Sequence, residues 1–120
     1  MIDLALAVDK FALYAELDIT ETARWRNLVA ASLQKVENCL KPDADVSKNT
    51  ALLANAAAAD AFFRFSLAET GRGDAWITVG SVSVKVDPAV RLESARELRN
   101  EAFASVSHLL KDNSFLFLRI

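Results

Sequence analysis

The longest apolar stretch of the chain spans residues 46–70 and has the sequence VSKNTALLANAAAADAFFRFSLAET. Placed on a helix, it is apolar nearly all the way round, and only Asn55, Asp60 and Arg64 interrupt it strongly. A helix with so little polar face is normally a central one that other helices surround. Because residues 56–59 are all alanine, neighbouring helices could approach its backbone closely. The pattern therefore predicts one long central helix.

Two helices are predicted before the central one. Apolar residues at near-helical spacing favour a short helix over residues 2–16. A second helix is expected over residues 23–40, with Thr20 as its N-cap and Pro42 ending it, since the residue before a proline avoids helical geometry. The predicted inward stripe of this second helix comprises Trp25, Leu28, Val29, Ser32, Leu33, Val36 and Leu40.

After the central helix the apolar period changes from that of a helix to that of a strand. Residues 75–79 and 82–86 are rich in β-favouring side chains and flank Gly80-Ser81, a Gly-X pair typical of a type II′ hairpin turn. Asp87 and Pro88 then provide a cap and a first-turn proline for a last helix that runs to about Lys111. The outward positions predicted for this helix are Arg91, Arg96, Arg99, Asn100 and Glu101.

Residues 115–120 finish the pattern as a short apolar strand. The predicted fold is mainly α and forms a single domain over residues 1–120, with about four helices in a bundle, a β-hairpin and this C-terminal strand. The strand could extend the hairpin within the chain or pair with a neighbouring subunit. Either arrangement would cover apolar residues that otherwise mark an interface.

Composition narrows the function classes. The chain has 120 residues, 52% of them hydrophobic, and a formal charge of −2, which disfavours a nucleic-acid binder without excluding a local basic patch. No apolar run approaches the roughly 20 residues that cross a bilayer, so no membrane association is expected. Cys39 is the single cysteine, so an intrachain disulfide is impossible and a reducing compartment is favoured.

Catalytic chemistry has little support in the sequence. His108 is the only histidine and lacks a partner at HxxxH or ExxH spacing, and Cys39 lacks a second cysteine. Gly71 and Gly73 follow a helix and precede a strand, which reverses the order of a phosphate loop. We therefore expect no enzyme activity, no catalytic or metal-binding residues and no cofactor.

Two charged patterns leave alternatives open. The last helix carries glutamates at i, i+4 spacing, namely Glu93, Glu97 and Glu101. This row indicates either a solvated face or an acidic stripe that binds a basic surface of a partner. Arginines on the second and last helices could form a basic patch, although the interleaved glutamates would weaken attraction to phosphates. A small helical regulatory or nucleic-acid-binding module is therefore the alternative function. Candidate interface residues are Trp76, Ile77, Val82, Val84, Phe115, Leu116, Phe117, Leu118, Arg91, Glu97 and Glu101.

The order of these elements resembles that of a viral protein family. A helix with WRNLVAASLQKVENCL, a helix with AAAADAFFRFSL, the segment ITVGSVSVKVDP, a last helix and a terminal strand look like the small helical head–tail connector proteins of tailed bacteriophages and prophages. These are also called head-completion or adaptor proteins. The nearest feature to a motif is VGSVSVK at residues 79–85, before the proline-started helix.

The resemblance implies a structural role in the virion, after synthesis in the bacterial host cytoplasm. Such proteins form a homo-oligomeric ring below the portal, join the filled head to the tail, and line the passage of double-stranded DNA. Their partners would be the portal and the tail or stopper proteins. A ring needs two unlike, complementary surfaces on each subunit. An acidic balance also suits a DNA passage, since a basic lumen would grip the duplex.

Overall fold

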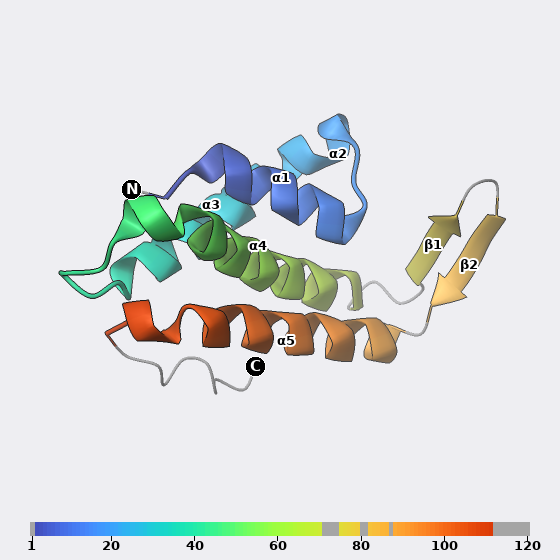
Figure 1. The fold of residues 1–120 in the computed structure, drawn as a ribbon. Helices are drawn as coiled ribbons and strands as arrows, with labels where there is room; N and C mark the ends of the chain where they lie inside the picture. The colour runs from blue at the N-terminus through green and yellow to red at the C-terminus, as the bar shows by residue number, and fades with distance from the viewer. Residues whose placement is uncertain (1, 71–74, 80–81, 87, 112–120) are drawn as a thin grey trace.

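The computed structural model describes residues 2–70, 75–79, 82–86 and 88–111, and it confirms the mainly helical class. Within those residues there are five α-helices where about four were expected, together with two strands and a short 3-10 helix (Figure 1). The elements are α1 (Leu4–Ala15), α2 (Ile19–Arg24), α3 (Arg26–Asn38), α4 (Val46–Thr70), β1 (Ala75–Val79), β2 (Val82–Val86), α5 (Pro88–Ser105) and η1 (Ser107–Leu109).

Helix α4 lies at the centre of the bundle, as its apolar pattern predicts. It packs against α1, α3 and α5 (Figure 1). The alanines at 54, 56–59 and 61 are completely buried, so neighbouring backbones approach α4 with little side-chain bulk between them. Phe65 then contacts Phe11 of α1 edge-on, with ring centroids 5.7 Å apart. The core is therefore built around one helix that presents mostly alanine along its middle and aromatic side chains toward its C-terminal end.

The predicted second helix is divided in the structure. Helix α2 ends at Arg24 and α3 begins at Arg26, with Trp25 between them in a non-helical conformation. The break coincides with an edge-on contact between Trp25 and Phe65 at 4.8 Å, a tertiary contact that local propensity does not encode. The prediction of Thr20 as N-cap is also wrong, because the Asp18 carboxylate accepts the backbone N–H of Glu21 at 2.8 Å.

The last helix is shorter than predicted and ends at Ser105. The chain then passes through η1, and Leu110 forms an antiparallel bridge with Leu40. Two backbone hydrogen bonds flank this bridge: Lys41 N–H donates to Leu109 C=O at 2.8 Å, and Lys111 N–H donates to Cys39 C=O at 2.7 Å. These bonds satisfy backbone groups that a continued helix would have used, so the bridge replaces the final helical turn.

Strands β1 and β2 pair antiparallel, with Ile77 opposite Val84. Figure 1 shows them beyond the ends of α4 and α5, away from the helices of the bundle. The predicted turn at Gly80-Ser81, the predicted helix stop at Gly71 and the predicted strand at residues 115–120 lie outside the described residues.

Candidate interaction surfaces

The register of β1 and β2 separates their residues into two unlike faces. Alternate residues of a strand point to opposite sides, and directly paired residues share a side. One face therefore carries only aliphatic residues, namely Ala75, Ile77, Val79, Val82, Val84 and Val86. The other face carries Trp76, Thr78, Ser83 and Lys85. Of the predicted interface residues, Ile77, Val82 and Val84 therefore share one face, and Trp76 lies on the other.

The predicted interface residues on α5 differ in how far they are exposed to a partner. Glu97 and Glu101 are exposed one helical turn apart, so they can contact a partner. Arg91 is half-buried, and its guanidinium lies 5.8 Å from the Phe62 ring centroid and 5.6 Å from that of Phe65. The remaining candidates, Phe115, Leu116, Phe117 and Leu118, lie outside the described residues.

A buried ionic cluster joins α3, α4 and α5 inside the bundle. The Asp60 carboxylate on α4 is completely buried, and its Oδ1 accepts the Nε–H of Arg99 on α5 at 2.8 Å. Its Oδ2 accepts the hydroxyl of Ser32 on α3 at 2.9 Å. Lys35 and Arg64 complete the cluster, with nitrogen atoms 3.5 Å and 3.2 Å from the carboxylate. One carboxylate thus connects three helices.

Arg99 corrects a sequence prediction, since it is 1% exposed where an outward position was expected. Its guanidinium also lies 5.7 Å from the Phe63 ring centroid and 5.2 Å from that of Phe103. The helical period could have located it, because Arg99 lies four residues after Ala95 and three before Ala102, and both alanines are buried. A charged residue on that face needs a buried partner, and Asp60 is that partner.

The cluster keeps Asp60 ionised. Burial alone would raise the pKa of the Asp60 carboxyl, but the hydrogen bond from Arg99, the charges of Lys35 and Arg64, and the Ser32 hydroxyl together hold that pKa below its usual value. For Lys35 the balance is reversed: burial, together with the charges of Arg99 and Arg64, outweighs the attraction of Asp60 and lowers the pKa of its ammonium. Asp60 and Arg99 therefore form the main pair, with Lys35 at its half-exposed edge.

These contacts weaken the idea of a basic patch on α5. Arg99 is buried against Asp60, and Arg96 lies 5.8 Å from the Phe63 ring centroid while its Nη1 is 2.6 Å from Glu93. On α2, Arg24 forms an exposed ion pair with Glu21 at 3.4 Å. Arginines held in this way offer less charge to a phosphate backbone than the sequence alone indicates.

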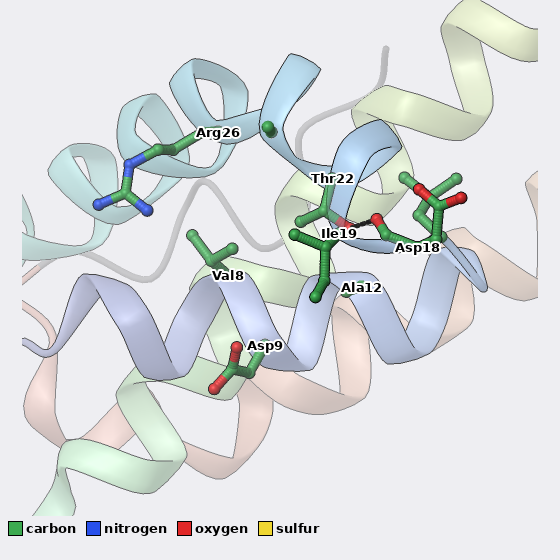
Figure 2. A pocket seen from close by; sticks show the side chains of 9 residues that line it. Val8, Asp9, Ala12, Asp18, Ile19, Thr22 and Arg26 are labelled. Carbon is green, nitrogen blue, oxygen red and sulfur yellow. Dashed lines mark hydrogen bonds between the residues drawn. The ribbon is translucent and has the colours of Figure 1, made fainter.

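An apolar groove opens between α1 and α2 next to the start of α3 (Figure 2). It encloses about 270 Å³. The apolar residues that line it are Val8, Ala12, Leu17, Ile19 and Ala23. Ile19 is 90% exposed, and the sequence analysis did not identify it. The groove arises where α1 and α2 meet, so no local pattern marks it.

A second hollow lies between α4 and α5 and encloses about 230 Å³. Asn55, Leu98 and Glu101 are among its lining residues. Nearby, the Tyr14 hydroxyl donates a hydrogen bond to the Asn55 side chain, while burial raises the pKa of that hydroxyl. This places the candidate Glu101 at the rim of a surface depression instead of on a flat helix face.

The residues considered for catalysis lie apart from these features. His108 is exposed on η1, and Cys39 is half-buried after α3. Within the described ranges, His, Cys, Asp and Glu form no group of three that could hold a metal ion.

The expectation that no apolar run is long enough to cross a membrane is corrected by α4. By length and composition, its residues Val46–Glu69 could do so. In the most apolar 18-residue window of that stretch, 61% of the residues are buried inside this fold, as in the core helix of a bundle.

Comparison of the chain with protein-family models, with curated proteins and with solved structures found no match.

Proposed function

We propose that this protein is a non-enzymatic virion assembly protein, a ring-forming head–tail connector that joins a phage portal to the tail. The proposal rests on the resemblance in element order. The observation that carries it furthest is the pair of strands that extends beyond the bundle and has one entirely aliphatic face.

An isolated two-stranded ribbon is marginal in water, and the register of this one places six aliphatic residues on one face. In an assembly protein, contact with a neighbouring subunit would cover that face. The subunits would form a homo-oligomeric ring that contacts the portal on one side and the tail or stopper protein on the other. Double-stranded DNA would pass through the lumen, and the formal charge of −2 suits passage better than retention.

The Asp60 cluster supports this role through rigidity. A carboxylate that bonds to α3 and α5 at once fixes the position of both helices against α4. Buried ionic groups can specify one arrangement of helices over others of similar packing. A ring closes only if each subunit presents its two interfaces at one constant angle, so a fixed bundle favours closure over open filaments.

Light scattering over a concentration series, followed by negative-stain microscopy of any large species, tests the proposal. The expected species is a closed ring of uniform diameter, formed by the chain alone or on a phage portal protein. A chain that stays at 13.1 kDa at every concentration and does not bind that portal would overturn the proposal. Salt-dependent binding to duplex DNA by this monomer would instead support a nucleic-acid-binding module.

A further inference from the structure

We propose that α2 is a strap that detaches from the bundle as one unit while α1, α3, α4 and α5 stay folded. The strap comprises residues 18–24 and lies between the end of α1 and the non-helical residue Trp25. Figure 1 shows it at the edge of the bundle. This motion is independent of how the protein assembles, so it goes beyond the proposed function.

The polar contacts of the strap stay within it. The Asp18 carboxylate accepts the Glu21 N–H at 2.8 Å, and the Thr22 hydroxyl donates to the Asp18 carbonyl at 2.7 Å (Figure 2). Arg24 forms its ion pair with Glu21 at 3.4 Å. As far as the structure describes the chain, residues 18–24 make no hydrogen bond or ion pair with α1, α3, α4 or α5. Detachment of the strap therefore breaks no polar contact with these helices.

Burial also holds the strap weakly. All six residues of α2 are described, and Thr22 alone is buried, whereas α1 buries Phe11 and α3 buries Val29. Ile19, the largest aliphatic side chain of α2, is 90% exposed. Hydrophobic stabilisation scales with the apolar area removed from water, so α2 gains far less from docking than its neighbours do. Regions with few buried apolar contacts open at a lower free energy than the whole fold.

The backbone allows α2 to move without unwinding α1 or α3. On the α1 side, the Leu17 N–H donates to the Ala12 carbonyl at 3.1 Å, and Asp18 is extended, with φ −78° and ψ 178°. On the α3 side, the Trp25 N–H bonds back into α2, while the Trp25 carbonyl accepts the Val29 N–H at 3.2 Å. The helical hydrogen-bond ladder is thus interrupted at both ends of the strap. A few residues at such element ends can absorb the change in φ and ψ that a hinge needs.

Detachment changes the surface beside α1. Isolated helices shorter than about 12–15 residues are marginal in water, so the six residues of α2 unwind when they leave the bundle. Because α2 supplies Ile19 and Ala23 to the wall of the α1–α2 groove, the groove exists only while the strap is closed. Opening exposes the Thr22 side chain and the groove residues of α1, Val8 and Ala12, to solvent.

The reaction rate of a buried thiol tests the strap. Two variants in a Cys39→Ser background are compared: Thr22→Cys in the strap and Val29→Cys in α3, at positions that are 7% and 0% exposed. Thr20→Cys, at an exposed position of α2, gives the rate of an accessible thiol on the same element. Each variant reacts with a chromogenic disulfide reagent at several urea concentrations below the unfolding midpoint.

We expect Thr22→Cys to react at least about 100-fold faster than Val29→Cys, because the strap opens at a lower free energy than the bundle. Its rate should change little with urea, since opening exposes little surface, whereas the rate of Val29→Cys should rise steeply. Equal rates with equal urea dependence would overturn the proposal, because α2 would then open only when the whole bundle unfolds.

Amide hydrogen exchange of the wild-type chain gives the same test without substitutions. The amides of Glu21, Thr22 and Trp25 are all hydrogen-bonded within residues 18–25. If the strap opens as one unit, their protection factors should agree within about threefold and lie at least about 100-fold below that of Leu33 in α3. Protection that rises steadily along α2 would show fraying from one end, and protection equal to that of Leu33 would show a firmly docked helix; either result would overturn the proposal.

Discussion

Replacing Arg99 with methionine should destabilise the fold strongly. Arg99 is 1% exposed and donates to the completely buried Asp60 carboxylate at 2.8 Å, so the substitution leaves a buried negative charge without its main partner. Removing one member of a buried ion pair costs about 3–5 kcal/mol. With a urea dependence of about 2 kcal/mol per M, the unfolding midpoint should fall by about 2 M.

The double variant Asp60→Asn/Arg99→Met separates the ionic term from simple loss of packing. Asparagine retains an oxygen that can accept the Ser32 hydroxyl, and no charge remains buried at that position. We therefore expect the double variant to be more stable than Arg99→Met alone, although it carries one more substitution. Urea unfolding followed by far-UV circular dichroism measures all the variants.

This reasoning would be refuted if Arg99→Met lowered the free energy of unfolding by less than about 1 kcal/mol, which is what a solvent-exposed ion pair contributes to stability. It would also be refuted if the two substitutions of the double variant were additive, since groups in one ionic network should couple by about 0.5–3 kcal/mol.

Three further predictions concern stability. The pKa of the Asp60 carboxyl is lower in the folded state, so the stability that its charge contributes is complete above the unfolded pKa of about 3.9 and is lost as the pH falls through the folded pKa. In an acid titration, wild type should therefore lose free energy of unfolding more steeply than Asp60→Asn/Arg99→Met. Lys35→Met should change the free energy of unfolding by less than about 1 kcal/mol, because burial opposes the Lys35 charge; a larger loss would make Lys35 a main partner. Glu16→Gly should raise the melting temperature by a few degrees, a gain of about 0.5–1 kcal/mol, because Glu16 has a φ of 56° in the left-handed region; an unchanged or lower value would contradict this.

The helical core was predictable because it depends on periodicity. The apolar sequence of α4 indicated a central helix, and the predicted inward stripe of α3 contains Val29, Ser32, Leu33 and Val36, all of which are buried. Burial of Ser32 follows from its position in that stripe, although its role as a donor to Asp60 does not.

The errors arise where tertiary contacts override local rules. Thr20 and Asp18 are comparable N-caps by propensity, and the choice between them depends on where the chain turns. The break between α2 and α3 at Trp25 coincides with the contact between Trp25 and Phe65. Helix α5 ends before the predicted residue, and Leu110 beyond it bridges to Leu40. None of these contacts is encoded within a short window of sequence.

The candidate surfaces were only partly predictable. The alternation along residues 75–79 and 82–86 predicted two paired strands, and the structure pairs them, with Ile77 opposite Val84. The α1–α2 groove depends on two helices meeting, so no local pattern marks it. Arg99 was misplaced because residue type was given more weight than its spacing from Ala95.

Sedimentation velocity of the wild-type chain beside its Ile77→Asp variant tests the central claim most directly. An aspartate on the aliphatic face should prevent that face from being buried, while circular dichroism checks that the helices remain. Each chain is run alone and mixed with a phage portal protein. Wild type should leave the 13.1 kDa position for a discrete high-mass species in at least one of the two samples, whereas Ile77→Asp should stay near 13.1 kDa in both and Leu52→Asp should behave as wild type does. Equal mass distributions for wild type and Ile77→Asp in both samples would contradict the claim that this face assembles the protein.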